Sequence, residues 1–170
     1  MRSLRLNAVL LEKKIWFAIC GLCLAGIGIA LLSQHAFDMQ PCAWCVFQRL
    51  IYLVLALVAA VGAFCQGFVI RLLCAMLSLS LTLTGMLAAW YQAQVASQSF
   101  SCAQTLADLL MTQTGLETAM PALFGIYASC MDARIKLFGL EYAYWSLLLF
   151  ALLSVLVVVV ISGFRSKKTY

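Results

Sequence analysis

Four long apolar runs dominate the hydrophobic pattern of the chain. They lie at about residues 15–34, 46–64, 72–91 and 143–163, and Arg49 is the one charged residue inside them. Because an α-helix rises about 1.5 Å per residue, about 20 residues cross the roughly 30 Å hydrocarbon layer of a membrane. Backbone polar groups in lipid must be satisfied within the segment itself, which favours helices over strands. The pattern therefore predicts an all-α integral membrane protein, in which residues 1–170 form a single membrane domain, a four-transmembrane-helix bundle.

The segments between the runs differ in length. The connection after the third run, about residues 92–142, is the longest, and a loop of that size is usually functional. Within it, Leu106–Met111 is predicted to form a turn or two of helix, and the apolar segment 121–127 is suited to lie on a membrane surface. The first run exceeds the apolar core of a signal peptide and no small-residue cleavage site follows it, so we expect it to remain as a span.

The composition excludes two broad classes of protein. Hydrophobic residues make up 65% of the chain and charged residues 10%, whereas an average soluble domain carries roughly 25% charged residues. A soluble globular protein is therefore excluded, and so is a disordered chain, which needs low hydrophobicity. The net charge of +5 comes without a dense basic stretch that would follow phosphates, so we expect no nucleic-acid partner.

Lysine and arginine residues are distributed unequally between the two sides of the spans. Eight lie in the predicted segments 1–14, 65–71 and 164–170, and two, Arg134 and Lys136, lie in the long connection. Because positive residues are retained on the cytoplasmic side, both termini are predicted to be cytoplasmic. The segments at about 35–45 and 92–142 then face outward, and the basic tail is placed to contact membrane lipids.

The eight cysteines fall into groups when they are sorted by predicted compartment. Cytosolic thiols stay reduced, whereas the outer side permits disulfides. Cys20 and Cys23 lie in the middle of the first span, where regular helix keeps them too far apart for a disulfide, and we interpret them as packing residues. Cys65 and Cys74 flank the cytoplasmic turn and are interpreted as structurally neutral. The remaining cysteines face outward: Cys42, Cys45, Cys102 and Cys130.

Cys42 and Cys45 form a C-x-x-C motif where the second span begins. Pro41 places Cys42 at or before the helix start, so the pair is not held in regular helix and a disulfide can close. The N-terminus of a helix also stabilises a thiolate. Arg49 follows Cys45 by four residues, on the same helix face, at a depth where an arginine is costly unless it has a function or reaches water. We interpret the pair as redox-active and Arg49 as functional; a static clasp and an arginine that extends to the membrane surface are the alternatives.

Cys102 and Cys130 share the long outer loop. A disulfide between them would constrain the unfolded chain and stabilise the fold by about 3–4 kcal/mol, so a structural staple is one interpretation. The loop has little core to hold, however, and lies beside a second cysteine pair at the membrane edge. That arrangement favours thiol–disulfide exchange.

These motifs together resemble the DsbB family, the quinone-dependent disulfide-generating proteins of bacterial inner membranes. The resemblance rests on Gln34-His35, Pro41-Cys42-x-x-Cys45-x-x-Gln48-Arg49, the Cys102 and Cys130 pair, and Phe138-Gly139-Leu140-Glu141-x-x-x-Trp145-Ser146-Leu147. It covers most of the chain, with the family's order of cysteines and number of helices. Many family members carry Arg-Gln or His near the outer end of the third span, where this chain has Trp90-Tyr91-Gln92. Arg49 alone is therefore carried over as a quinone-site residue.

The resemblance implies a route for electrons through the outer cysteines. A periplasmic DsbA-like thiol oxidase would pass electrons to Cys102 and Cys130, with Cys102 forming the mixed disulfide. Exchange would pass them to Cys42 and Cys45, and Cys45, the nearer to Arg49, would contact quinone, either ubiquinone or menaquinone. The membrane quinone pool and the respiratory chain would then be partners. The protein would lie in the bacterial inner membrane with its redox loops in the periplasm.

Three other functions remain as alternatives. A metal-binding protein would use Cys42, Cys45 and His35, with Cys102 or Cys130 as the fourth ligand, since soft metals prefer such ligands. A scaffold membrane protein with structural outer-face disulfides belongs to the same alternative. A relative of vitamin K epoxide reductase would also have four helices, but there the C-x-x-C motif follows the loop pair, whereas here it precedes it. Reversed electron flow needs a cysteine pair reachable from the cytosol, and Cys65 and Cys74 form no C-x-x-C motif.

Overall fold

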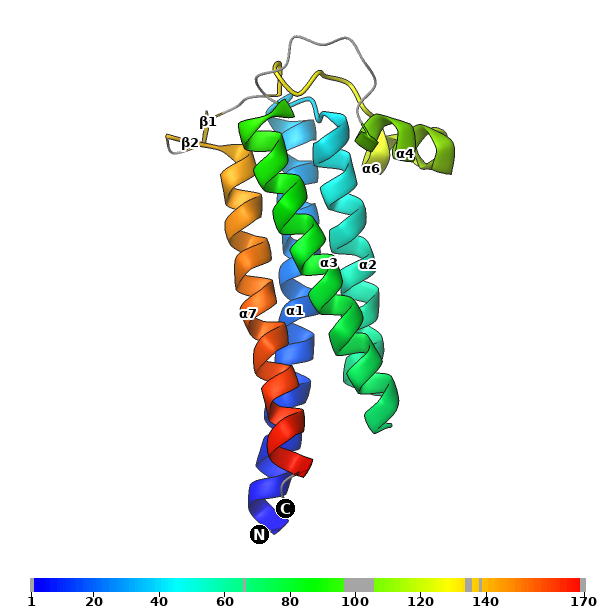
Figure 1. Cartoon of the computed structure of the whole chain (residues 1–170). Coiled ribbons are helices and arrows are strands. Elements are labelled where there is room, and N and C mark those ends of the chain that lie inside the picture. Colours follow the sequence, from blue (N-terminus) through cyan, green and yellow to red (C-terminus); the bar gives the residue numbers. More distant parts are fainter. Residues whose placement is uncertain (1, 66, 97–105, 134–135, 138, 169–170) are drawn as a thin grey trace.

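Four long helices form the body of the protein and run side by side along one axis (Figure 1): α1 (Arg2–Ala36), α2 (Ala43–Phe64), α3 (Phe68–Gln94) and α7 (Tyr142–Lys168). The computed structural model describes residues 2–65, 67–96, 106–133, 136–137 and 139–168, with side chains between residues 10 and 164 of these ranges. Each long helix contains a segment long and apolar enough to cross a membrane. The predicted four-helix membrane fold is therefore confirmed.

The long helices extend beyond the apolar runs that predict them. Helix α1 starts at Arg2, and α3 begins directly after Gly67, whose backbone is extended. Residues 68–71, predicted as part of a connection, therefore form the first turn of α3, and residues 92–94 form its last. The start of α1 and the end of α7 lie at the same end of the bundle (Figure 1), opposite the outer loops.

Small residues at two helix crossings allow the bundle to pack closely. Helix α3 packs against α7, and α1 packs against α2. A Cβ atom at Gly85 of α3 would overlap the ring of Phe150 in α7. A Cβ atom at Gly62 of α2 would lie 2.9 Å from the ring of Trp16 in α1. Both crossings thus depend on the absence of a side chain on one helix.

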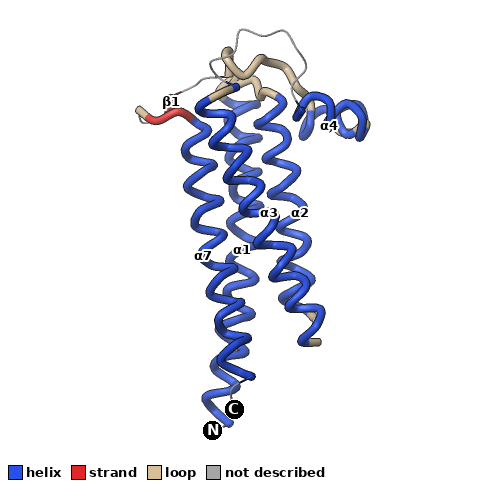
Figure 2. The backbone as a smooth tube through the Cα atoms, viewed as in Figure 1, coloured by secondary structure: helices blue, strands red, loops and turns tan. Residues whose placement is uncertain are grey.

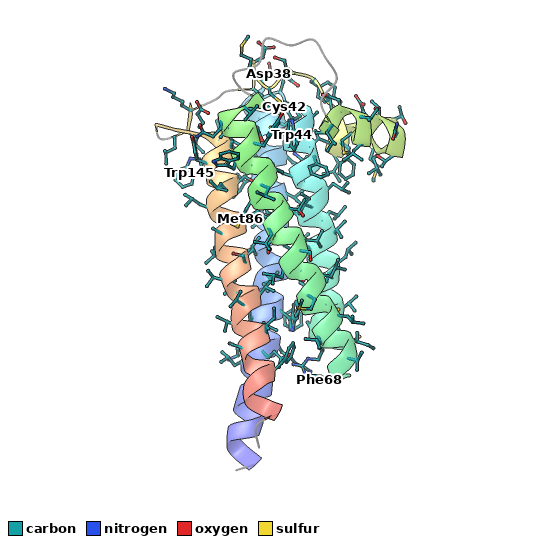
Figure 3. All side chains as sticks on the ribbon, in the orientation of Figure 1. Asp38, Cys42, Trp44, Phe68, Met86 and Trp145 are labelled. Carbon is teal, nitrogen blue, oxygen red and sulfur yellow. The ribbon has the colours of Figure 1, made fainter. Side chains whose placement is uncertain are left out.

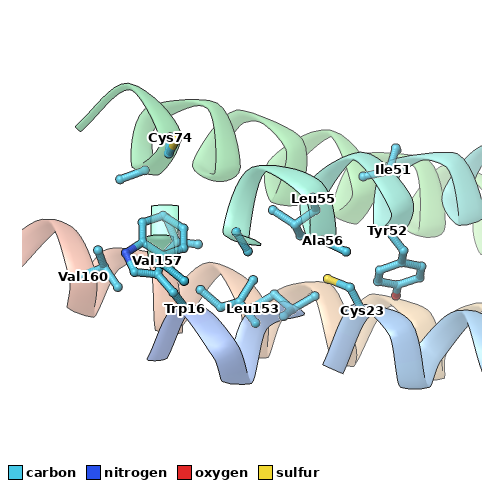
Figure 4. Close-up of a cluster of buried hydrophobic side chains, with 14 of the residues drawn as sticks. Trp16, Cys23, Ile51, Tyr52, Leu55, Ala56, Cys74, Leu153, Val157 and Val160 are labelled. Carbon is cyan, nitrogen blue, oxygen red and sulfur yellow. The ribbon is translucent and has the colours of Figure 1, made fainter. Parts of the chain in front are cut away.

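The hydrophobic core lies between the four helices (Figure 4). Its fully buried members include Trp16, Leu55 and Leu153. Cys23 is also fully buried in this core, as its interpretation as a packing residue requires. Tyr52 lies at the loop-side end of the core and stacks on the ring of Phe150, with ring centroids 4.2 Å apart.

An ion pair joins helices at the opposite end of the bundle. Arg71 of α3 pairs with Glu12 of α1, and both side chains are largely buried. The Arg71 guanidinium also lies over the ring of Phe164 in α7, 5.6 Å from its centroid. Charged and aromatic contacts thus connect three helices on the side predicted to be cytoplasmic.

The long outer loop carries its own short elements. Helices α4 (Leu106–Thr114), α5 (Leu116–Ala119) and α6 (Pro121–Phe124) lie beside the start of α2, and α4 projects to the side of the bundle (Figures 1 and 2). Met111 and Phe124 are fully buried there against Val46. Strands β1 (Lys136–Leu137) and β2 (Leu140–Glu141) then pair antiparallel before α7 begins. Gly139, in the turn between them, has φ of 83°, which favours glycine.

Candidate functional site

The C-x-x-C motif lies at the start of α2, at the loop end of the bundle (Figure 3). Cys42 occupies the N-cap position with an extended backbone, φ −88° and ψ 169°, and Cys45 lies in the first turn. Their Sγ atoms are 3.1 Å apart, and both are free thiols in the structure. Because regular helix does not constrain Cys42, the two sulfurs can approach each other and exchange between dithiol and disulfide.

The segment that leads to Cys130 is fixed on this motif by its backbone. The amides of Tyr127 and Ala128 both donate to the carbonyl oxygen of Pro41, at 3.1 and 3.3 Å. Pro41 directly precedes the C-x-x-C motif, so these two bonds align the outer loop with it. Cys130, a free thiol, then packs in the small buried cluster that contains Cys42.

Cys130 and Cys42 form a hydrogen-bonded thiol pair. This bond is the main cause that raises the pKa of Cys42 well above its ordinary value, and burial acts in the same direction. The same bond lowers the pKa of Cys130, although burial opposes it. The backbone amide of Trp44 also donates to Cys130 and lowers its pKa further. Cys130 is therefore the more acidic thiol of the pair and Cys42 the less acidic one. Three of the four predicted redox cysteines meet here, because Cys45 lies beside Cys42; Cys102 lies outside the described residues.

Two buried glutamines connect α2 and α3 beside the cysteines. Gln48 Nε2 donates to Gln92 Oε1 at 2.7 Å. Gln92 Nε2 in turn donates to the Sγ atoms of Cys45, at 3.1 Å, and of Cys42, at 3.7 Å. Gln48 and Gln92 are only 4% and 6% exposed. Because Gln48 occupies the amide oxygen of Gln92, the amide NH₂ group is held toward the sulfurs, where it stabilises negative charge.

Arg49 is held inside the protein and does not extend to the surface. Its side chain is 5% exposed. Nη1 donates to Gln34 Oε1 at 2.7 Å and to the carbonyl oxygen of Leu123 at 3.1 Å, and Nη2 donates to the carbonyl oxygen of Ala30 at 3.3 Å. These contacts argue against the alternative in which Arg49 extends toward water.

A cavity of about 310 Å³ lies beside Cys45 and Arg49. Its volume is in the range of small-molecule sites, which are mainly apolar with a few fixed polar groups. Arg49 Nε is buried and has no hydrogen-bond partner in the described part of the chain. A flat ring with oxygen atoms at its edge, such as a quinone head group, fits this lining. The lining includes Gly26, Cys45, Gln48, Arg49, Tyr52, Gln92, Tyr142, Trp145, Ser146 and Leu149.

The metal-binding alternative receives no support from the described residues. The three cysteines that meet here are not arranged as a group that could hold a metal ion, and neither is any other set of three or more His, Cys, Asp or Glu side chains among the described residues. His35, the third ligand of that alternative, lies in the last turn of α1 with an exposed side chain. A scaffold role also leaves the polar groups at the cavity unexplained.

The sequence analysis assigned no role to Gln92, Tyr52 or Ser146, which all line the cavity. A signal was nevertheless present, because polar groups inside an apolar span are costly and often functional. The spacing in the sequence does not reveal that α2, α3 and α7 turn these three side chains toward one another.

Comparisons with known proteins agree with this arrangement. A family model described as disulfide bond formation protein DsbB matches residues 12–160. The chain is 32% identical over 148 residues to Disulfide bond formation protein B of Dechloromonas aromatica (strain RCB). The aligned region covers 80% of this chain and 84% of that protein. It is also 32% identical over 158 residues to Disulfide bond formation protein B of Pseudomonas syringae pv. tomato, and that aligned region covers 92% of this chain and 93% of that protein. A relative in Pasteurella multocida is 24% identical over 151 residues, covering 88% of this chain and 85% of that protein.

Proposed function

Because the chain belongs to the DsbB family of disulfide bond formation proteins, we propose that its outer cysteines pass electrons from a DsbA-type thiol oxidase to membrane quinone. The family gives the general activity: the chain is a multi-pass membrane thiol oxidoreductase that generates disulfides with a partner thiol oxidase, and its activity is linked to quinone. One observation carries the assignment of residues. Cys42, Cys45 and Cys130 meet beside a cavity that Arg49 also lines.

The first half of the proposed reaction takes place between the two cysteine pairs. A thiolate of the partner attacks the Cys102–Cys130 disulfide at Cys102, a mixed disulfide forms, and Cys130 leaves as a thiolate. The position of Cys130 within hydrogen-bond distance of the Cys42 sulfur supports the next step, because the two sulfurs lie close enough for exchange. Cys130 attacks Cys42 in the Cys42–Cys45 disulfide, and Cys45 leaves as a thiolate that lines the cavity. The second thiol of the partner then displaces Cys102 and closes the partner's own disulfide. Cys102 attacks Cys130, which restores the Cys102–Cys130 disulfide and releases Cys42.

The second half takes place at the cavity. Cys42 and Cys45 form their disulfide there and give up two electrons and two protons, for which a quinone beside Arg49 would supply the acceptor. Gln92 donates to the Cys45 sulfur, and Arg49 adds positive charge four residues further along the same helix face. Both groups stabilise the thiolate that gives up the electrons. The Arg49 guanidinium also stabilises negative charge that develops on a carbonyl oxygen in the cavity.

The proposal includes a location. We place the chain in the bacterial inner membrane, with both termini in the cytoplasm and the cysteine-bearing loops in the periplasm, because eight of the Lys and Arg residues lie on the side of the termini. Ubiquinone or menaquinone of the respiratory chain would then serve as electron acceptor. Labelling of Cys42, Cys45, Cys102 and Cys130 by a membrane-impermeant maleimide, after reduction of intact cells, checks this topology; labelling only after the cells are lysed would overturn it.

The decisive experiment measures quinone consumption by the purified full-length protein with a reduced DsbA-type partner. Cys45→Ser is expected to abolish quinone reduction by any thiol. Cys102→Ser is expected to block oxidation of the partner and to leave part of the reaction with small dithiols. Cys65→Ser serves as control and should behave as wild type. If Cys45→Ser and Cys102→Ser both oxidise the partner at the wild-type rate, the relay is wrong.

A further inference from the structure

We propose that the hydroxyl groups of Tyr52 and Ser146 form a second polar end of the cavity and bind the quinone carbonyl opposite the one that Arg49 binds. The inference rests on the proposed function and adds to it two positioning residues and a ligand class, a 1,4-quinone with both carbonyl groups free. It begins from a polar pair that nothing in the cysteine relay uses.

The pair lies between α2 and α7 at the wall of the cavity. Tyr52 Oη is 2.9 Å from Ser146 Oγ and 3.3 Å from the carbonyl oxygen of Ser146. Tyr52 is 5% exposed, and its ring is stacked on Phe150, with an angle of 3° between the planes. Tyr52 and Ser146 both line the cavity that Cys45 also lines. The stacking on Phe150 fixes the position of the Tyr52 hydroxyl group.

The spacing along α2 places Tyr52 on the same helix face as the redox end of the cavity. Cys45, Arg49 and Tyr52 follow one another by four and three residues, so they lie on one face of the helix. Three residues rise roughly 4.5 Å along the axis. Arg49 and Tyr52 therefore line the cavity at successive levels of α2, so one ligand can contact donors from both.

The hydrogen atoms of the pair also allow it to bind an acceptor. Ser154 and Ser162, on the same helix, each donate to the carbonyl oxygen three residues earlier, at 2.8 Å. Ser146 makes no such bond among the described residues; its side-chain partner is Tyr52. When Tyr52 donates to Ser146 Oγ, the hydroxyl hydrogen of Ser146 is released toward an acceptor in the cavity.

Donors at both ends of the ring favour the reaction itself. Two thiol groups and a quinone give a disulfide and a quinol, so each carbonyl oxygen gains electron density and one of the two thiol protons. Arg49 stabilises the oxygen nearer to the cysteines, and the hydroxyl pair stabilises the other. The pair thus binds the ligand, and its hydrogen bond to the carbonyl oxygen becomes stronger as that oxygen gains electron density during reduction.

The first measurement is binding, separate from turnover. Tetramethyl-1,4-benzoquinone is titrated into the full-length protein in detergent with its cysteines kept oxidised, and quenching of tryptophan fluorescence reports binding, because Trp145 lines the cavity. Tyr52→Phe keeps the stacked ring and removes one hydroxyl group; Ser146→Ala removes the other. Each is expected to raise the Kd about threefold to tenfold, the effect of one neutral hydrogen bond. The double variant should be little weaker than the weaker single variant, because the two hydroxyl groups act on one oxygen.

Matched controls stand on the same helix. Ser154→Ala removes a serine hydroxyl that donates to Ala151, and Tyr144→Phe removes a tyrosine hydroxyl that accepts from Gln94. Neither residue lines the cavity, so both variants should keep the wild-type Kd. In turnover with a small dithiol, Tyr52→Phe should raise KM for the quinone more than it lowers kcat.

Two results would overturn the inference. If the Kd is unchanged in both hydroxyl variants while the unfolding temperature falls, the pair only joins α2 to α7. If Kd rises equally in the control variants, the loss is not specific to the pair. Should Tyr52→Phe fail to fold, Ser146→Ala alone decides, since it removes a single oxygen atom. If the wild-type protein does not reduce quinone at all, the proposed function is refuted instead, so the two failures are distinguishable.

Discussion

The amide group of Gln92 offers a sharp test of the site, because it donates to both sulfur atoms of the C-x-x-C motif. In Gln92→Leu the two N–H donors are lost, while the shape of the side chain is largely kept. The amide of Gln48 then also loses its acceptor. A thiolate accepts a hydrogen bond much more strongly than a disulfide sulfur does, so the reduced form of Cys42 and Cys45 loses more than the oxidised form.

The size of the effect follows from the strength of one such bond. A hydrogen bond to a charged group contributes about 1.5–3 kcal/mol. For a two-electron couple about 30 mV corresponds to 1.4 kcal/mol and to a tenfold change in the equilibrium constant. The reduction potential of the Cys42 and Cys45 pair is therefore expected to fall by about 30–60 mV in Gln92→Leu.

The measurement uses equilibration with mixtures of reduced and oxidised dithiothreitol. Cys102 and Cys130 are replaced by serine, so that the exchange belongs to the C-x-x-C pair, and mass spectrometry of alkylated peptides gives its reduced fraction. Gln94→Leu is the control, because Gln94 lies two residues away on α3 and donates to Tyr144 instead. An unchanged potential in Gln92→Leu, or an equal fall in Gln94→Leu, would refute the role of the amide.

Three further predictions concern the acidity of two cysteines, the packing at a helix crossing and an ion pair. In the reduced protein, alkylation of Cys130 by iodoacetamide should reach half its maximal rate at a lower pH than alkylation of an ordinary thiol, and that of Cys42 at a higher pH. The reason is that their hydrogen bond lowers the pKa of Cys130 and raises the pKa of Cys42. Mass spectrometry across pH measures both rates, and the reverse order would contradict the prediction. Gly85→Ala should lower the free energy of unfolding by about 1–3 kcal/mol, because the new carbon overlaps an aromatic ring of α7, whereas Gly21→Ala, with nothing within 4 Å, should not; unfolding in detergent measures both. Glu12→Gln should lower the free energy of unfolding by on the order of 3 kcal/mol, because Arg71 is left without its charged partner. The double variant Glu12→Gln, Arg71→Met should recover most of that loss, and a double-mutant cycle in the same assay tests this.

The helices were predictable from the sequence because lipid leaves the backbone few options. A long apolar run that must satisfy its own hydrogen bonds becomes a helix, and the chain has four such runs. The position of Cys42 was also predictable, since Pro41 and the motif spacing are local. The same holds for the place of Arg49 relative to Cys45, which follows from the helical repeat.

Contacts between distant segments could not be predicted in this way. The rotation of α3 that turns Gln92 toward the cysteines depends on packing, including the fit of Gly85 against Phe150. The approach of Cys130 depends on two loop amides that bond to the carbonyl oxygen of Pro41, a backbone group without any sequence signature. The role of Cys102 stays a prediction, because it lies outside the described residues.

The charge balance of the site connects its structure with its direction of electron flow. The hydrogen-bond partners of Arg49 in the described structure are neutral oxygens, from Gln34, Leu123 and Ala30. A buried positive charge with neutral partners is costly, and the cost falls when a negative charge forms nearby. In the relay that we propose, reduction of the disulfide provides that charge at Cys45, and a quinone oxygen in the cavity would provide it next. In that relay the same arginine favours acceptance of electrons from the outer loop and then their transfer into the cavity, which is the direction that disulfide formation requires.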